Sequence, residues 1–252
     1  MAANKLPYDI SVQNIGREFG GQSVHGLIHR LNALNVRKWE DYFIGDTIHS
    51  GYATVTGVDG TFSIESDDDH AKLAASTGTG ASGEYCGAAL PGLAVKGDRY
   101  PVIMCRLALD VITTVKVEFG LTDAKDDAGA VNALATPTFT ADDAVVWILD
   151  TDDTGYWQCC GVKDGTGATK IEPGIAPTAA TYEYLGIAVR DTFAKFLRWN
   201  DDGYLTYESA WMEDAITKTD PLTPWVFVQL RGACDRNVQF EMLRCYWNFT
   251  NA

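Results

Sequence analysis

The sequence predicts an all-β protein, built as an antiparallel β-sandwich or a barrel. About ten or more short segments alternate apolar with polar residues, and turn signals separate them without intervening helices. Glycine is abundant at 24 residues, which suits many turns. With 252 residues, the chain forms one large β domain or two small ones, and it can bury a core without disulfide or metal staples.

The clearest strand pattern runs over residues 100–123. Two apolar sets alternate with other residues there: Ile103, Cys105, Leu107 and Leu109, and then Val115, Val117, Phe119 and Leu121. A period of two places each set on one face of a strand. We therefore expect an antiparallel hairpin with one apolar face, which a second layer must cover.

Residues 1 to about 45 lack this strand rhythm. Apolar side chains at three- and four-residue steps predict a short amphipathic helix there: Val24, Leu27, Ile28, Leu31 and Leu34. An apolar cluster follows at Trp39, Tyr42, Phe43 and Ile44. We assign residues 1–45 to an N-terminal arm and residues 46–252 to the β domain. We expect the arm to attach to the domain or to a partner through Leu27, Ile28, Leu31, Leu34 and Trp39.

The remaining elements follow from short apolar runs and turn residues. Residues 52–58 and 61–64 flank Asp59-Gly60, a strong hairpin signal. The small and polar tracts 74–83 and 165–181 are expected to be loops. Three more strand pairs are expected: 145–149 with 156–162, 185–189 with 194–198, and 226–230 with 238–242.

The charge balance limits the partners that the chain can have. Its 20 basic and 34 acidic residues give a formal net charge of −14. Such a surface repels phosphate, so nucleic acid and anionic membranes are not expected as partners. No apolar run is long enough to span a membrane, and the first residues do not resemble a secretory signal. The six cysteines form no CxxC pair, which argues against a zinc site. We expect the protein to be made in a reducing cytoplasm and its cysteines to be free, buried thiols.

No catalytic residue can be assigned from sequence motifs. There is no G-x-S-x-G, and all four histidines lie within the first 70 residues. His25 and His29 have the i, i+4 spacing of a metal pair, but without HExxH or a third ligand we favour structural or partner-facing roles. Glu65, Asp67 and Asp69 would share one strand face, as paired glycosidase carboxylates could. Because residues 65–70 are wholly polar, a solvated loop is favoured, with a weak Ca²⁺ site as the alternative.

Aromatic residues expected to be exposed are the best candidates for glycan contact, since sugars stack on flat rings. Three are singled out: Tyr156, Trp157 and Trp211. Packing in a sandwich core, or contact between subunits, is the alternative role for such residues.

The order of the segments resembles the concanavalin A-like lectin/glucanase fold, a jelly-roll sandwich. The resemblance covers roughly residues 50–250 and rests on these features in order: the Gly-rich loop, Pro91-Gly92, the Arg106 strand, residues 119–123, residues 188–200, the Asp202-Gly203 turn and the closing strands between Trp225 and Trp247. Similar layouts occur in uncharacterised structural proteins of tailed-bacteriophage virions. The glucanase branch carries ExDxxE on one strand, and the nearest match here, residues 65–70, lacks the final Glu.

The resemblance implies a scaffold used for binding or for building. Our leading hypothesis is a non-enzymatic virion structural protein without a cofactor, made in the host cytoplasm. It would decorate a capsid or form a head fibre through its arm. Its partners would be the major capsid protein or another virion protein, further copies of itself as a dimer or trimer, and a host-surface glycan. The alternative is a carbohydrate-binding module or receptor-binding adhesin, and the third possibility is a glycoside hydrolase.

Overall fold

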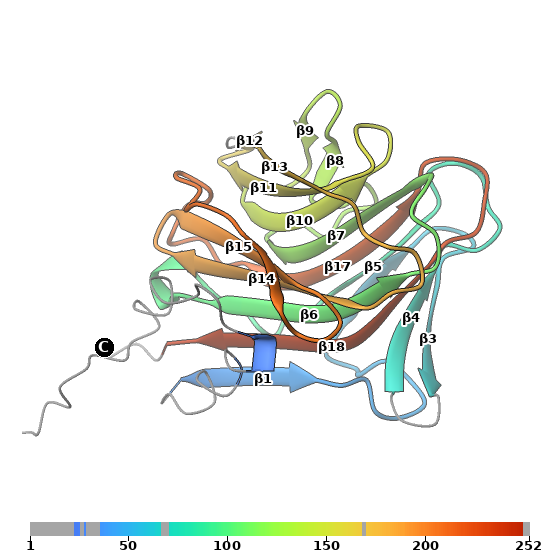
Figure 1. Cartoon of the computed structure of the whole chain (residues 1–252), viewed down its shortest axis with the longest axis horizontal. Helices are drawn as coiled ribbons and strands as arrows, with labels where there is room; N and C mark the ends of the chain where they lie inside the picture. Colours follow the sequence, from blue (N-terminus) through green and yellow to red (C-terminus); the bar gives the residue numbers. More distant parts are fainter. Residues whose placement is uncertain (1–22, 26–27, 29–35, 67–70, 168–169, 249–252) are drawn as a thin grey trace, which may run out of the picture.

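The computed structural model describes residues 23–25, 28, 36–66, 71–167 and 170–248. Within these residues, two eight-stranded antiparallel sheets stack face to face (Figure 1). Helical conformation among them is limited to a 3-10 turn at Gly97–Arg99 and to Val24, His25 and Ile28. The predicted all-β sandwich is confirmed.

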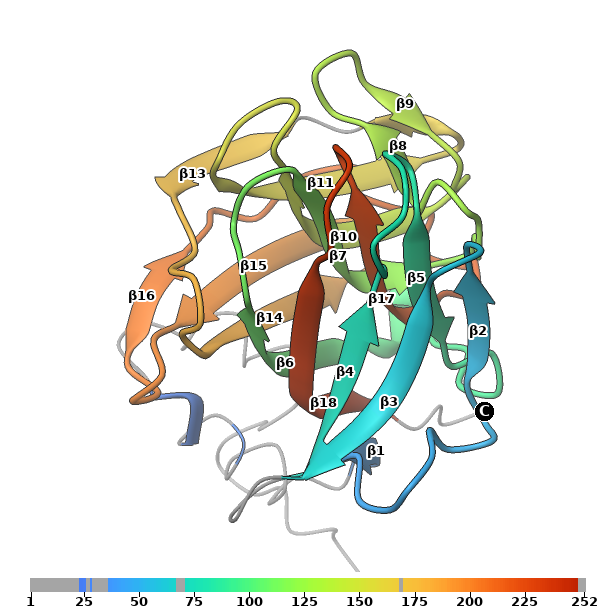
Figure 2. The same cartoon turned by 90° about the vertical axis from the view of Figure 1, so that its right-hand side faces the viewer.

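Sheet A contains the C-terminal strand near its centre, and Figure 2 shows β18, β4 and β3 side by side. A further strand, β1 (Arg37–Asp41), pairs with β18. The others, in spatial order, are β16 (Leu205–Glu208), β15 (Phe193–Trp199), β14 (Glu183–Arg190), β6 (Val102–Leu109), β18 (Asn237–Trp247), β4 (Ala71–Ser76) and β3 (Thr61–Ser66).

Sheet B lies across the core from sheet A, and an additional small hairpin sits on its outer side (Figure 1). In spatial order its strands are β12 (Thr166–Gly167), β11 (Trp157–Lys163), β10 (Ala144–Asp150), β7 (Val115–Thr122), β17 (Thr223–Leu230), β5 (Tyr85–Ala89) and β2 (Ala53–Thr56), with β13 (Ile171–Ile175) also paired to β11. The small hairpin is formed by β8 (Val131–Ala133) and β9 (Thr138–Phe139).

The predicted hairpin over residues 100–123 is wrong in its pairing, although both strands exist. Strand β6 belongs to sheet A and β7 to sheet B, so residues 110–114 cross from one sheet to the other. The two apolar sets still lie in the same core, because they face each other across the space between the sheets. Alternation identifies the buried face of a strand, but it does not identify the hydrogen-bonded neighbour.

Two further predicted pairs are wrong for the same reason, and two are confirmed. Strands β2 and β3, around Asp59-Gly60, lie in different sheets, as do β17 and β18. Pairing is confirmed for β10 with β11 and for β14 with β15. The expected loop at 74–83 begins later than expected, because β4 continues to Ser76. The expectation of a loop over 165–181 is wrong in part, because β12 and β13 lie within it and pair with β11.

The core between the sheets is centred on aromatic side chains from both layers. Trp147 of β10 has its ring centroid 5.6 Å from that of Phe196 and 6.4 Å from that of Trp157. Its indole Nε1 donates to the carbonyl of Gly186 on β14, at 3.0 Å. The side chain therefore joins sheet B to sheet A by both packing and a buried hydrogen bond.

Part of the predicted N-terminal arm belongs to the sandwich. Strand β1 extends sheet A, and Trp39 packs against the core with its ring 5.8 Å from that of Tyr52. Val24, His25 and Ile28 have helical backbone conformation. The expected anchor residues Leu27, Leu31 and Leu34 lie outside the described residues. Within the described part of the chain, no helix has the length and apolar character needed to cross a membrane.

Truncating a central core side chain tests this architecture. Phe119 is fully buried between the sheets, so Phe119→Ala should lower the free energy of unfolding by about 3–5 kcal/mol. Val58 is 93% exposed, and Val58→Ala should change it by less than about 0.5 kcal/mol. Urea denaturation followed by tryptophan fluorescence measures both variants. Equal losses in the two would contradict the placement of β7.

Candidate functional site

The three aromatic residues expected to contact a glycan do not form one platform. Trp157 is fully buried in the core, where its Nε1 donates to Glu183 Oε1 at 2.8 Å, so the expectation of glycan contact is wrong for this residue. Tyr156 is 47% exposed in the turn between β10 and β11. Trp211 is half-buried, and the Arg190 guanidinium covers its ring at 4.8 Å from the centroid.

The polar tract at residues 65–70 gives no assembled site. Glu65 is exposed at the end of β3, while Asp67 and Asp69 lie outside the described residues. Among the described residues, no three His, Cys, Asp or Glu side chains are grouped as a metal site requires. A weak Ca²⁺ site at this tract stays a prediction.

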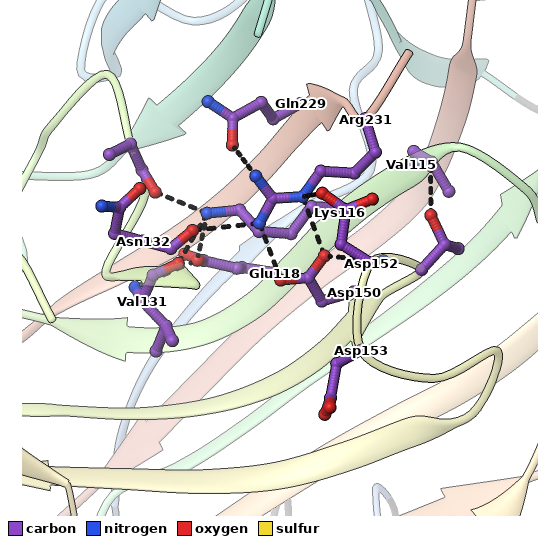
Figure 3. Close-up of polar contacts among 12 residues, drawn as sticks. Val115, Lys116, Glu118, Val131, Asn132, Asp150, Asp152, Asp153, Gln229 and Arg231 are labelled. Atoms are coloured by element: carbon purple, nitrogen blue, oxygen red, sulfur yellow. Dashed lines mark hydrogen bonds and ion pairs between the residues drawn. The ribbon is translucent and has the colours of Figure 1, made fainter. Parts of the chain in front are cut away.

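A buried charge network lies on the outer face of sheet B (Figure 3). Lys116 and Glu118, on β7, have no exposed side-chain surface, and Lys116 Nζ lies 3.2 Å from Glu118 Oε1. The Glu118 carboxylate also accepts hydrogen bonds from the backbone N–H groups of Ala130 and Val131, at 2.8 and 3.1 Å. A fourth partner, Trp225 Nε1, donates to it at 2.9 Å. Every direction around this carboxylate is therefore occupied by protein.

The same network fixes residues 124–143, which we call the flap, over sheet B. Lys116 Nζ donates to the carbonyl of Val131 at 2.6 Å. Arg231 forms a two-pronged ion pair with Asp150, at 2.7 and 2.8 Å, and also donates to the carbonyl of Asn132 at 3.0 Å. Burial lowers the pKa of Lys116, and the adjacent Glu118 carboxylate opposes part of that effect.

Apolar side chains of the flap also pack against apolar side chains of sheet B. The flap contributes Ala130, Val131, Leu134 and Ala141, and the sheet contributes Val146, Ile148, Cys160, Trp225 and Phe227. These residues form a packed cluster of their own. The outer face of sheet B is therefore closed by the chain itself, and the carboxylates of Glu118 and Asp150 are held for structure in this conformation.

The outer face of sheet A, in contrast, carries a pocket of about 480 Å³. Strands β6, β14 and β18 form its floor, and two segments from the start of the chain form its sides. It is lined by His25, Ile28, Tyr42, Ile44, Ala71, Arg106, Tyr184, Glu241, Met242 and Arg244. Its size falls within the range of sites that bind small molecules.

Arg106 lies on the floor of this pocket and is held from several sides. Its Nη2 lies 2.6 Å from Asp201 Oδ1, and its Nη1 pairs with Glu241. The guanidinium also stacks 4.1 Å from the ring centroid of Tyr182. Its Nε is buried and has no hydrogen-bond partner among the described residues. The side chain is thus rigidly placed with one donor unused.

Arg244, on β18, has a matching arrangement. Its Nε lies 3.5 Å from Glu40 Oε1, its Nη2 donates to the hydroxyl of Tyr42, and its guanidinium carbon is 5.0 Å from the centroid of that ring. The hydroxyl of Tyr246 donates to Glu40 at 2.9 Å. Burial disfavours the charged form of Glu40, but hydrogen bonds from Lys38 and Tyr246, together with the charge of Arg244, lower its pKa overall.

The pocket therefore combines donors and acceptors without a large excess of charge. Each guanidinium pairs with carboxylates. Arg106 pairs with both Glu241 and Asp201, and Arg244 pairs with Glu40. Two tyrosine rings supply flat surface beside these groups: Tyr184, which is mostly buried, and Tyr42, which is 43% exposed.

Sequence reasoning missed this pocket. The available signal was a charged residue inside two strongly apolar strands, Arg106 between Cys105 and Leu107 and Arg244 between Leu243 and Cys245. A polar residue at an alternate strand position normally faces solvent, so the pattern does not distinguish these two arginines from ordinary surface residues. Only the pairing of β6 with β18 places the two arginines on one face.

No family model and no curated protein matches the sequence. Solved structures do match. Peanut lectin with a nine-residue peptide has a TM-score of 0.60 at 7% identity, covering 87% of this chain and 100% of the lectin. A Bacteroides ovatus GH16 protein in complex with a glucan product has a TM-score of 0.56 at 9% identity, covering 81% and 98%. Bacillus licheniformis β-glucanase has a TM-score of 0.54 at 10% identity, covering 86% and 100%.

The fold is the concanavalin A-like jelly roll. At these identities the likeness shows the fold alone. The expectation that the chain is not an enzyme is overturned, because proteins of matching fold include glucanases as well as lectins. A missing ExDxxE motif at residues 65–70 is therefore no ground for excluding hydrolysis.

The buried charge network predicts strong coupling between Lys116 and Glu118. Lys116→Met leaves the carboxylate buried without its cation, so it should cost about 3–5 kcal/mol of unfolding free energy. The double variant Lys116→Met/Glu118→Gln removes both charges and should recover part of that loss. Urea titrations of the wild type, both single variants and the double variant give the coupling energy. A coupling energy below about 0.5 kcal/mol would contradict the network.

Proposed function

We propose that the chain binds an uncharged carbohydrate in the pocket on the outer face of sheet A. One observation carries the proposal: Arg106 and Arg244, each held by a carboxylate and a tyrosine ring, face the same pocket. The fold supports it, since structures of similar fold include a lectin complexed with galactose.

The chemistry of the pocket suits a polyhydroxyl ligand. Each sugar hydroxyl both donates and accepts, so it can bridge a guanidinium N–H and a carboxylate oxygen that lie side by side. The partly exposed ring of Tyr42 offers the apolar surface on which the C–H face of a sugar can stack.

The charges around the pocket favour an uncharged sugar over an acidic one. Both arginines already have carboxylate partners, and a ligand carboxylate would have to compete with Glu241 and Glu40 for them. The chain as a whole carries a formal net charge of −14, which repels anionic ligands at long range. We therefore expect neutral hexoses and their oligomers to bind in preference to sialylated or uronic glycans.

The proposal predicts that binding depends on Tyr42 and not on Tyr156. We expect Tyr42→Ala to weaken binding at least about tenfold, or about 1.4 kcal/mol. Tyr156→Ala is the matched control, because it removes a ring of similar exposure outside the pocket. Isothermal titration with galactose, glucose, mannose, lactose and cellobiose measures both, and affinity should change little between about 50 and 500 mM NaCl.

Three results would count against this site. They are no binding by the wild type to any of the five sugars or to a wider glycan array, loss of binding in Tyr156→Ala with retention in Tyr42→Ala, and preferential binding of acidic glycans. Release of reducing sugar from cellobiose or a mixed-linkage glucan would instead identify a hydrolase.

For the biological setting, we propose a structural protein of a tailed-phage virion, in which the sugar is a host-surface glycan. The resemblance carried by the Arg106 strand and residues 119–123 supports this setting. The chain would attach to the major capsid protein or another virion protein as a dimer or trimer, by way of its N-terminal residues. It would be made in the host cytoplasm and then incorporated into the particle.

Immunogold labelling tests the setting directly. Antibodies against the purified chain should decorate the heads or head fibres of the phage particles that encode it, and light scattering should give the mass of a dimer or trimer. A monomer that is absent from purified particles would contradict the virion role while leaving sugar binding intact.

A further inference from the structure

We infer that Val24 fixes in place the wall of the sugar pocket that His25 and Ile28 form, so that ligand binding is coupled to the docking of these three residues (the segment) on sheet A. The inference rests on the proposed function. It assigns a positioning role to Val24, which lies in the part of the chain that was expected to hold a partner.

Val24 is the point at which the segment is fastened. Its side chain is fully buried, and its backbone N–H donates to the carbonyl of Gly203 at 2.9 Å. Gly203 has a φ of +80°, and a Cβ placed there would lie 2.9 Å from Val24 Cγ1. The close approach of the two residues thus depends on glycine at position 203.

The next residues of the segment reach the pocket itself. The His25 ring lies edge-on to Tyr184, with the centroids 6.2 Å apart. Ile28 packs against an apolar cluster on the outer face of sheet A that includes Met104 and Met242. Both His25 and Ile28 line the pocket together with Arg106 and Arg244.

The turn that receives Val24 also holds Arg106. Asp201, two residues before Gly203, pairs with Arg106 Nη2 at 2.6 Å. The turn is closed by a hydrogen bond from the Gly203 N–H to the Asn200 carbonyl at 2.9 Å. The residue that receives Val24 therefore lies two positions from a carboxylate partner of an arginine on the pocket floor.

The opposite wall is held in a different way. Tyr42 and Ile44 follow β1, and all five residues of β1 are paired in register with β18. The pocket therefore has one wall built into the sheet and another fastened by Val24. A ligand that contacts both walls binds only the docked form, so its affinity falls with the docked fraction. By the same linkage, the ligand must stabilise docking.

The experiment compares two Val→Asp substitutions. Val24→Asp places a charge at a fully buried position and should undock the segment. We expect the affinity for the best of the five sugars to fall at least about tenfold, since an undocked wall contributes nothing. Val58→Asp, at a 93% exposed position, is the matched control and should bind as the wild type does. Val24→Ala should cause a smaller loss of sugar affinity, and it replaces Val24→Asp in the comparison if Val24→Asp does not fold.

Hydrogen exchange distinguishes coupling to the ligand from a purely structural role of Val24. If Val24 only stabilised the fold, adding sugar would not change the exchange rate of its amide. The Val24 amide is the donor to Gly203, so its exchange in the wild type should slow as the sugar is added and should saturate with binding. The inference is overturned if saturating sugar leaves this amide unchanged, or if folded Val24→Asp binds as tightly as the wild type while Tyr42→Ala does not. If the wild type binds no sugar at all, the proposed function itself has failed.

Discussion

Trp147 joins the two sheets, and the rest of the structure depends on this contact. Its ring packs against Phe196 of the opposite sheet, and its indole nitrogen donates to Gly186 there. Each sheet also has an outer face. Both outer faces carry apolar side chains, so part of each must be covered to exclude water. Two different solutions follow, one on each side of the molecule.

On the outer side of sheet B, the flap is bound by charges that are wholly withdrawn from water. A buried Lys–Glu pair stabilises only when its remaining donors and acceptors are satisfied. Here Glu118 has the Ala130 and Val131 amides and the Trp225 indole as partners in addition to Lys116. The result is a specific packing site for the flap on this face of sheet B.

On the outer side of sheet A, charged groups are paired as well, but they surround a space. Arg106 and Arg244 are held by carboxylates and tyrosine rings at the edge of a pocket of about 480 Å³. The chain's first described residues pack over the neighbouring apolar surface. The proposed binding and the coverage of the sheet therefore involve the same residues, and this is the basis of the proposed coupling between Val24 and the ligand.

The positions of many strands could be predicted from the sequence, but β1 and β13 were missed, and only some pairings were predicted correctly. The alternation of Ile103 to Leu109 and of Val115 to Leu121 correctly marked two strands and their buried faces. It suggested a hairpin because a short connection usually joins hydrogen-bonded neighbours. In the sandwich, residues 110–114 instead carry the chain across the core, as the connections after β2 and β17 also do. Both arrangements bury the same side chains, so the local pattern cannot distinguish them.

The site was less predictable than the fold. Trp157 was expected to be an exposed aromatic residue available to a glycan, but it faces inward on β11 and packs against Trp147. Lys116 and Glu118 have the spacing of solvent-facing residues, but the flap and the neighbouring side chains of β17 bury them. By itself, the sequence determined an all-β chain, its strands and the apolar face of each. The tertiary structure decided which strands are neighbours, which polar side chains are buried and where a pocket opens. The physical reason is that alternation is a property of one strand, whereas sheet membership and burial depend on segments that are distant in the chain.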